Sequence, residues 1–421
     1  MSKLPREWKE LSLEDICIPK GIRRGPFGGA LKKDIFVPNG YKVYEQKNAI
    51  SKDLSLGQYF ITEEKYNEME AFQVKENDFL ISCSGTIGKI VQIPNNYKQG
   101  IINQALLKLT LNNFVINDTF FKYQFESDKI QSLIVDNTQG GAMPNLVGMS
   151  IFKNTKFIIP PLEEQKKIAD ILSTVDKKIV FVEENINATE ELKKGLMQKL
   201  LTEGIGHTEF KDSGLSIVYE LKKIPQDWNL EKLNFLANKI TDGAHFTPTY
   251  VSEGIPFLRV TDLKSKDILN SDIKFIPESE HIELIKRCKP EYGDILYSKN
   301  GTIGLTRLVD WEWEFSIFVS LCLIKPKIEI IDKNYLKYYL ESNMVLNQIR
   351  IRSKQGTVTN LHLEEIRDFF VTVPPLAEQK QIAEILSTVD NKLENLKEKK
   401  QSFEELKKGL MQKLLTGEVR V

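Results

Sequence analysis

The sequence predicts a mixed α/β protein made of two copies of one unit, each a globular part followed by a long α-helix. Three observations predict this fold class. A segment recurs almost unchanged at residues 160–202 and 374–416. Both copies of that segment carry apolar residues every seven positions. The rest of the chain alternates short β-rich runs with stretches of helical spacing, and it repeats weakly in the same order.

The globular parts contain short apolar runs bounded by Gly, Pro and Asn, which predict strands. The strand-like runs are FLISC, ALLKLTL, GIPFLRV and FVSLCLI. Two longer runs have helical spacing, namely FFKYQFESDKIQSLI and YLKYYLESNMVLNQI. We therefore expect a partly antiparallel sheet with helices in each globular part.

The repeat sets the expected domain organisation. The two copies of the constant segment align without a gap at an offset of 214, and 29 of 43 positions are identical. Upstream, NDFLISCSGTIGK from Asn77 matches GDILYSKNGTIGL from Gly293, and INDTFFKYQFES from Ile116 matches IDKNYLKYYLES from Ile331. We expect globular parts at residues 1–159 and 203–373, and long helices at 160–202 and 374–421.

Each constant segment predicts a long helix with one apolar stripe. A Pro-Pro pair at 160–161 and at 374–375 fixes the entry, where the missing amide donors cost least. The stripes repeat every seven residues, which is coiled-coil spacing. A lone helix cannot bury such a stripe, so we expect the two helices to pack on each other. The expected helix-pairing residues are Ile168, Leu172, Val175, Ile179, Val182 and Leu196 with Ile382, Leu386, Val389, Leu393, Leu396, Phe403 and Leu410.

Composition excludes several classes of protein. With 28% charged and 9% aromatic residues the chain is typical of a globular protein. Its 58 Lys and Arg balance 58 Asp and Glu, so any nucleic-acid contact must come from local charge. The four cysteines form no CxxC pair, which argues against a zinc or disulfide framework. A charged amino terminus and the lack of a long apolar stretch predict a cytoplasmic protein that spans no membrane.

The two globular parts, each followed by a PPLxEQxxIAxIL helix that ends in ELKKGLMQKLL, closely resemble the specificity subunit of type I restriction-modification systems. The resemblance covers essentially the whole chain. It implies that each globular part is a target-recognition domain for one half of a bipartite target in double-stranded DNA. It also implies that the helices form an antiparallel coiled coil, on which two methyltransferase subunits and two restriction subunits assemble.

The same resemblance implies a non-catalytic chain without a cofactor or metal of its own. S-adenosylmethionine, ATP and magnesium would bind the partner subunits, which methylate adenine and cleave DNA. The sequence agrees, because it has no [DN]PP[YF] methyltransferase motif, no Walker A motif and no Pro-Asp dipeptide to begin a PD-(D/E)xK nuclease site. Since the globular parts differ in sequence while the helices barely do, the two half-sites should differ.

The clearest candidate for DNA contact is the basic segment PKGIRRGPFGGALKK, which holds no acid. Its cations can neutralise phosphates, and arginine reads guanine in the major groove. A solvated loop is the alternative. The corresponding segment of the second half, KITDGAHFTPTY, is less basic and favours base edges or water-mediated contacts. The candidates are Lys20, Arg23, Arg24, Lys32 and Lys33 in the first segment, and Lys239, Thr241, His245 and Thr247 in the second.

Two paired GTIG turns and two glutamines complete the candidate set. The turns have the wrong spacing for a P-loop, so the glycines indicate a shared turn whose polar neighbours are candidates for DNA contact. The glutamines follow the helical stretches, where helix capping and phosphate contact both fit. These candidates are Ser84, Thr86 and Lys89 with Gln139, and Lys299, Asn300 and Thr302 with Gln355.

Three alternatives remain open from the residues. Gly195 and Gly409 inside the constant helices fit either close approach of a partner or a tolerated kink. A fused methyltransferase-specificity enzyme is disfavoured by the missing motifs. A coiled-coil scaffold without affinity for DNA is distinguished by a DNA-binding measurement.

Overall fold

The chain forms two compact units in a computed structural model that describes residues 5–136, 145–215, 221–265, 267–352 and 360–421. Unit 1 comprises Met1–Glu183 with Glu398–Val421, and unit 2 comprises Glu184–Lys397. The long helices α6 (Leu162–Thr202) and α12 (Leu376–Leu414) each contribute one part to unit 1 and the other part to unit 2.

The described strands of unit 1 form four small sheets, one of which is the short antiparallel pair of β9 and β10. Strands β2, β8, β5 and β6 make an antiparallel four-stranded sheet in that order, and β4, β3 and β7 make a three-stranded sheet in which β3 and β7 are parallel. Strand β1 pairs with β11. The elements are β1 (Lys9–Ser12), β2 (Cys17–Arg24), β3 (Tyr41–Tyr44), α1 (Gln46–Ile50), β4 (Phe60–Ile61), α2 (Glu63–Glu68), β5 (Phe79–Ser82), β6 (Ile90–Gln92), β7 (Gly100–Ile102), β8 (Leu106–Leu111), α3 (Asp118–Phe125), α4 (Asp128–Ile134), β9 (Val135–Asp136), β10 (Asn145–Leu146), α5 (Met149–Asn154) and β11 (Lys156–Ile159).

Unit 2 repeats the topology of the two larger sheets and of the β1–β11 pair, and it has a further pair, β12 with β13. Its four-stranded sheet has the order β15, β21, β18, β19, its three-stranded sheet the order β17, β16, β20, and β14 pairs with β22. The mixed, duplicated fold class predicted from the sequence is thus confirmed. The elements are β12 (Phe210–Asp212), β13 (Lys223–Pro225), β14 (Asn229–Lys232), α7 (Leu233–Leu236), β15 (Ala237–Asp242), β16 (Ile255–Leu258), β17 (Lys274–Ile276), α8 (Glu278–Arg287), β18 (Ile295–Ser298), β19 (Thr306–Leu308), β20 (Ser316–Ile317), β21 (Leu321–Pro326), α9 (Lys333–Leu340), α10 (Asn343–Arg352), α11 (Leu363–Arg367) and β22 (Phe370–Val373).

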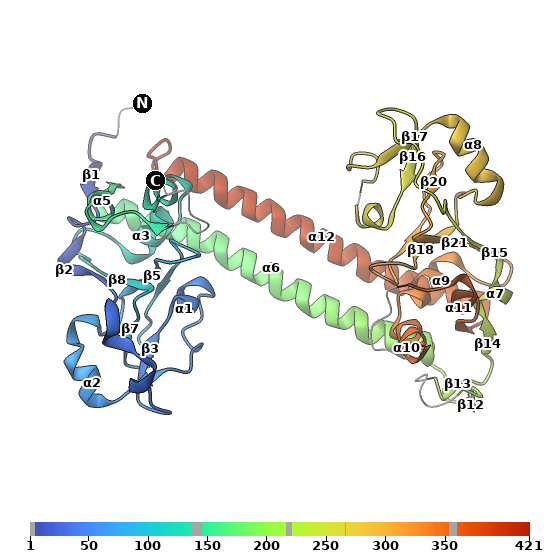
Figure 1. The fold of residues 1–421 in the computed structure, drawn as a ribbon, viewed down its shortest axis with the longest axis horizontal. Coiled ribbons are helices and arrows are strands. Elements are labelled where there is room, and N and C mark those ends of the chain that lie inside the picture. Colours follow the sequence, from blue (N-terminus) through green and yellow to red (C-terminus); the bar gives the residue numbers. More distant parts are fainter. Residues whose placement is uncertain (1–4, 137–144, 216–220, 266, 353–359) are drawn as a thin grey trace. The chain divides into compact units, whose positions relative to one another are not determined.

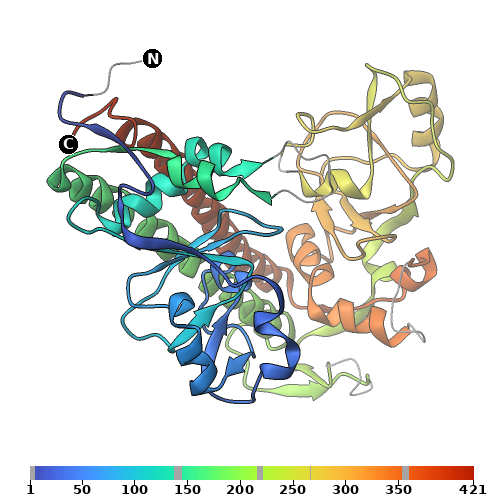
Figure 2. The ribbon, with the colours of Figure 1, turned by 60° about the vertical axis from the view of Figure 1, so that its left-hand side comes forward.

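Within each unit the long helices run antiparallel and side by side, α6 in green and α12 in red (Figures 1 and 2). In unit 1, Lys407 pairs with Asp176 at 2.7 Å and Lys400 pairs with Glu183 at 2.8 Å, so positions rise along one helix as they fall along the other. In unit 2, Lys193 pairs with Asp390 at 2.6 Å. The antiparallel arrangement expected from the resemblance is therefore present in both units.

The apolar stripes face inward along both helices. None of the expected pairing residues is exposed. Those buried are Ile168, Leu172, Val175, Val182, Ile382, Leu386, Val389 and Leu393, and those half-buried are Ile179, Leu196, Leu396, Phe403 and Leu410. Near the start of each helix the stripe also enters the globular core. Ile168 and Leu172 share one hydrophobic cluster with Leu414 of α12 and with the strands of unit 1.

A buried glutamine fastens each long helix to its globular part. The side chain of Gln379 accepts a hydrogen bond from the amide of Asp332 at 2.7 Å and donates to the carbonyls of Ile330 and Pro374. Gln165 makes the same three bonds in unit 1. Because both side chains are fully buried, each satisfies backbone groups that water cannot reach.

Replacing Gln379 by alanine should lower the free energy of unfolding of unit 2 by about 2–4 kcal/mol, because three buried backbone groups lose their partner. The measurement is urea or thermal unfolding followed by circular dichroism. Gln198→Ala, on the exposed side of α6, is the matched control and should change stability by less than about 0.5 kcal/mol. Equal effects of the two variants would contradict this role of Gln379.

Candidate nucleic-acid interface

In unit 1 the basic segment and the GTIG turn leave the four-stranded sheet at the same edge. Arg24, the last residue of β2, lies opposite Leu107 of β8, and Leu107 lies opposite Ile81 of β5. Strand β5 ends one residue later, at Ser82, and the turn follows. Arg23 and Arg24 are therefore brought next to the turn that contains Ser84, Thr86 and Lys89.

Unit 2 gathers the equivalent segments at the equivalent edge. Asp242 ends β15 opposite Cys322 of β21, and Cys322 lies opposite Tyr297 of β18. Figure 1 shows β15, β21 and β18 next to one another. A third segment joins them, because Asn300 forms a β-bridge with Asn360. We call each of these edges, with the loops that leave it, the strand-end surface.

One serine in each unit fixes the shape of the GTIG turn. The Ser82 hydroxyl donates to the carbonyl of Thr86 and accepts from the amide of Lys89. Ser298 makes the equivalent bonds to Thr302 and Leu305. The two glycines of each turn have positive φ angles, between 64° and 90°, a conformation that glycine adopts without strain. Both turns thus have the same backbone conformation, so their polar side chains occupy equivalent positions.

The predicted contact residues divide into exposed, partly buried and buried groups. Side chains that face solvent are free to meet a ligand, whereas buried ones can act only through their neighbours. The exposed candidates are Lys20, Lys32, Thr86, Lys89, Lys239, His245, Thr247 and Thr302; the half-buried ones are Arg23, Arg24, Ser84 and Asn300; the buried ones are Thr241 and Lys299.

Some candidates lie away from the strand-end surface or outside the described structure. Lys20 precedes the end of β2 by four residues, beside an irregularity in the pairing with β8. Lys239 lies near the start of β15, where its ammonium donates to the carbonyl of Arg287 at 2.6 Å. Lys33 begins a short 3₁₀ helix, but its side chain lies outside the described part, as do Gln139 and Gln355.

At the strand-end surface of unit 2, one buried carboxylate gathers three basic side chains. Asp242 Oδ1 accepts from His245 Nε2 at 3.0 Å and from Arg287 Nη2, and Oδ2 lies 3.2 Å from Lys299 Nζ. The Asp242 side chain is 3% exposed, whereas those of His245 and Arg287 are 57% and 54% exposed. The carboxylate is therefore an internal anchor for groups that reach solvent.

The electrostatics of this cluster favour the charged form of Asp242. Burial by itself favours the neutral acid, but hydrogen bonds from His245 and Lys299 and their positive charge outweigh it, so the pKa of Asp242 is lowered from 3.8. In unit 1 the arrangement is different. Arg24 stands where Asp242 stands in unit 2, and its guanidinium lies 5.3 Å from the centroid of the exposed Phe27 ring.

Sequence reasoning missed Asp242 and Arg287. Asp242 lies within the segment that was singled out, but its role depends on the strand register that places it opposite Cys322. Arg287 ends α8, 37 positions after the end of that segment in sequence. Lys286 and Arg287 at the end of an amphipathic stretch could have indicated a helix terminus, but nothing in the sequence indicates its partner.

One group in the described residues has ligands close enough to suggest a metal, namely His207, Asp227 and Glu378. The two carboxylates contact opposite nitrogens of the ring, Glu378 at Nε2 and Asp227 at Nδ1, so they do not converge on one point. Glu378 also accepts from the Trp228 indole at 2.9 Å. In unit 1 an arginine, Arg420, pairs with the equivalent Glu164, so we interpret both groups as structural ion pairs.

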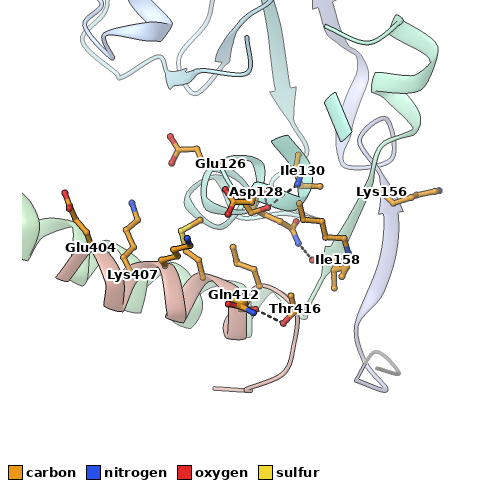
Figure 3. Close-up of a pocket in the computed structure, with 15 residues that line it drawn as sticks. Glu126, Asp128, Ile130, Lys156, Ile158, Glu404, Lys407, Gln412 and Thr416 are labelled. Atoms are coloured by element: carbon orange, nitrogen blue, oxygen red, sulfur yellow. Dashed lines mark hydrogen bonds between the residues drawn. The ribbon is translucent and has the colours of Figure 1, made fainter. Parts of the chain in front are cut away.

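A cavity of about 660 Å³ opens in unit 1 between the last turns of α12 and the α3–α4 turn (Figure 3). Ile130 and Ile158 line one side, and Lys407 and Gln412 of α12 line the other. This cavity lies at the constant helix and not at the strand-end surface. In the described part of the chain, no helix combines the length and apolar character needed to cross a bilayer.

Comparison with known proteins gives one consistent family. A family model described as the type I restriction modification DNA specificity domain matches residues 5–191 and again residues 225–405. The type I restriction enzyme MjaVIII specificity subunit of Methanocaldococcus jannaschii is 31% identical over 358 residues, which are 83% of this chain and 80% of that protein.

Two solved structures are similar in fold. The S subunit of a type I restriction-modification system from M. genitalium has a TM-score of 0.56 and 18% identity, covering 98% of this chain and 97% of its own. A chain from a study of complex assembly and conformational transition of the type I R-M system has a TM-score of 0.61 and 17% identity, covering 100% of both chains. At these identities the likeness concerns the fold alone.

The lowered pKa of Asp242 predicts an acid-sensitive contribution to stability. The unfolded carboxyl takes up its proton near 3.8, and the folded one does so only at lower pH. The contribution is therefore present above 3.8 and is lost as the pH falls through the folded pKa. We expect the difference in melting temperature between the wild type and Asp242→Asn to shrink as the pH falls from 5 towards 3. A difference in melting temperature that stays constant over this pH range would contradict the stabilising role of the ionised Asp242.

Proposed function

Because this chain belongs to the family of type I restriction-modification DNA specificity proteins, we propose that it reads an asymmetric, bipartite target in double-stranded DNA. Each half-site is read by one recognition domain, which we assign to residues 1–159 and 203–373. The chain itself is a non-catalytic subunit that recognises DNA sequence. The observation that carries the proposal is that two copies of one fold gather different polar side chains at the same strand-end surface.

The two strand-end surfaces differ in the charge that they present, and this supports unequal half-sites. In unit 1, Arg23 and Arg24 each have a buried Nε without a hydrogen-bond partner among the described residues. A buried donor without a partner costs free energy, which a phosphate or base oxygen would recover. In unit 2 the equivalent position is the carboxylate of Asp242. Arginine reads guanine and contacts phosphate, so different bases should be favoured.

The DNA contacts that we propose are the exposed and half-buried polar groups of the two surfaces. Lys20 and Lys239 lie away from the strand ends, and the exposed Lys32 lies in the loop that follows β2. All three suit phosphate contact, which sets affinity and its salt dependence. The buried Thr241 and Lys299 would act by holding their neighbours. We keep Lys33, Gln139 and Gln355 in the proposed set on sequence grounds.

The constant ends of α6 and α12 suit a common partner. Residues 190–202 and 404–416 are identical, although many of them are exposed and need no identity for packing. Beside Gly195 and Gly409, apart from the adjoining residues and backbone of the same helix, no described atom lies within 4 Å of where a Cβ would stand. We therefore assign the identical ends of these helices, residues 190–202 and 404–416, to two methyltransferase subunits, and through them to two restriction subunits.

The chemistry of modification and cleavage then belongs to the partners. No residue set in this chain is assigned to a cofactor. S-adenosylmethionine, ATP and magnesium would be bound by the methyltransferase and restriction subunits, in the cytoplasm, where the DNA lies. Adenine methylation and ATP-dependent cleavage would be directed to the sequence that this chain reads.

The function is tested by selecting from a random DNA pool with the chain assembled with its methyltransferase subunit. We expect a split motif with two different halves to be enriched. Replacing residues 1–159 by a recognition domain of another specificity should change one half only, and the converse exchange of residues 203–373 should change the other. Indifference to sequence at low salt would favour a scaffold, and a change in both halves would contradict the modular assignment.

The partner surface is tested by placing a bulky side chain on α12. Gly409→Leu should leave the chain folded, because the space beside Gly409 is open and leucine is the better helix former by about 0.5–1 kcal/mol. We expect it to weaken methyltransferase binding by about 1–3 kcal/mol through overpacking, as measured by titration calorimetry. Ser402→Leu, on an exposed position outside the identical stretch, is the control. Equal binding by both variants would remove this helix face from the interface.

A further inference from the structure

The most unusual side-chain cluster in the described residues is the one around Asp242, where a strand, a loop, a helix end and a turn contribute one charged or titratable group each. Asp242 comes from β15, His245 from the following loop, Arg287 from the end of α8, and Lys299 from the turn after β18. Asp242 and His245 are neighbours in sequence, whereas Arg287 and Lys299 lie 45 and 57 positions after Asp242. Isolated surface charges can be explained by solubility alone, but the convergence of these groups on one carboxylate indicates a more specific role.

The contacts divide the cluster into an inner pair and an outer pair. Asp242 and Lys299 are 3% and 8% exposed, and their oppositely charged groups lie 3.2 Å apart. A buried ion pair of this kind is costly to break by removing one partner only. His245 and Arg287 share the other carboxylate oxygen and are more than half exposed. The ion pair of Asp242 and Lys299 thus fixes the position of the carboxylate, and His245 and Arg287 donate hydrogen bonds to it.

The geometry leaves part of the Arg287 guanidinium available. Among the described residues, its only hydrogen-bonding nitrogen is Nη2, which donates to Asp242 and lies 3.3 Å from His245 Nε2. Nε and Nη1 have no partner there. A cavity of about 200 Å³ adjoins the cluster and is lined by Gly243, Ala244 and Phe246 as well as by Arg287. A guanidinium fixed by a carboxylate on one nitrogen can still donate to a guanine from its remaining ones.

The comparison of the two units supports the same role. In unit 1 the residue at the end of the strand is itself an arginine, Arg24, and the position of Lys299 is taken by the neutral Cys83. In unit 2 the strand ends in an acid, and an arginine from α8 is brought to that acid instead. Both strand-end surfaces therefore carry a guanidinium near the same point of the sheet, by different routes.

We propose that Arg287 is a base-reading residue of the second recognition domain and that Asp242 is the positioning residue that orients it together with His245. This inference rests on the proposed function, since it presumes that unit 2 meets DNA at its strand-end surface. It adds a helix residue and a buried acid to a proposed contact set that otherwise consists of strand, loop and turn residues. The chemistry recognised is a hydrogen-bond acceptor pair such as O6 and N7 of guanine.

The test uses the full chain with its methyltransferase subunit and a library of DNA sites that varies each position of both half-sites. Arg287→Ala should reduce discrimination at one base pair of the second half-site by about 5- to 150-fold and leave the first half-site unchanged. Arg287→Lys should also lose most of the discrimination at this base pair, because an ammonium cannot replace a planar guanidinium. Lys286→Ala, the neighbouring exposed cation, should leave all base preferences as they are.

The positioning role is tested by removing the carboxylate without leaving a buried charge. The double variant Asp242→Asn with Lys299→Met makes both inner residues neutral and keeps their size, so the fold is preserved where a single change could disrupt it. It should relax the same base pair as Arg287→Ala, and adding Arg287→Ala should cause little further loss. This non-additivity is not expected of a merely structural change.

Each outcome separates this inference from the proposed function. If the wild type enriches a split motif but Arg287→Ala alters no position, the base-reading role is wrong and the function stands. If Arg287→Ala weakens all sequences equally with a shallower salt dependence, Arg287 contacts phosphate and the inference is again wrong. If the double variant keeps the preference that Arg287→Ala loses, Asp242 is not the positioning residue. A wild type without sequence preference contradicts the proposed function itself.

Discussion

The apolar stripes of α6 and α12 leave water only by packing on each other and on the globular cores, and both units depend on this constraint. The core of unit 1 contains Ile168 from the start of α6 and Leu414 from the end of α12. The core of unit 2 contains Leu200 from the end of α6 and Ile382 from the start of α12. Each compact unit is therefore completed by a segment that lies far away in the sequence.

The polar contacts follow the same pattern and define where each helix starts. A buried glutamine and a carboxylate in the first turns bind the globular part, as Gln165 and Glu164 do in unit 1. Tyr123 donates to Asp176, and Tyr338 donates to Asp390, at matching places on the two helices. These polar groups are repeated together with the apolar stripe because both attach a long helix to its globular part. Where residues of the repeated segment are buried, packing and hydrogen bonding explain why the two copies have the same residue.

The strand-end surfaces show how one scaffold carries two chemistries. The sheet order and the serine-fixed turn are the same in both units, so the backbone offers equivalent positions. At one of these positions unit 1 has Arg24 and unit 2 has Asp242, and the neighbouring side chains differ accordingly. A rigid frame with variable residues at its edge is an economical arrangement for reading different DNA sequences, since the core is unaffected by changes at the edge.

Much of the architecture follows from the sequence, because repetition and periodicity are properties of neighbouring residues. The duplication, the two long helices and the strand-like runs such as FLISC all became elements of the expected type. Both helical runs became two short helices each, α3 with α4 and α9 with α10. In the first run the reason is that Ser127 caps a new helix by accepting from the amide of Ile130. The candidate surface was predicted in part, since the basic segment and the GTIG turn were recognised separately.

The sequence by itself determined that two similar units exist and which faces of their helices are apolar, since heptad spacing and internal identity need no third dimension. Only the tertiary structure decided which polar groups act together. Arg24 meets the turn after β5 through the register of β2 on β8, and Arg287 meets Asp242 because α8 ends beside β15. Such pairings depend on strand register and helix placement, which are set by packing over the whole unit and leave no mark at the individual residues.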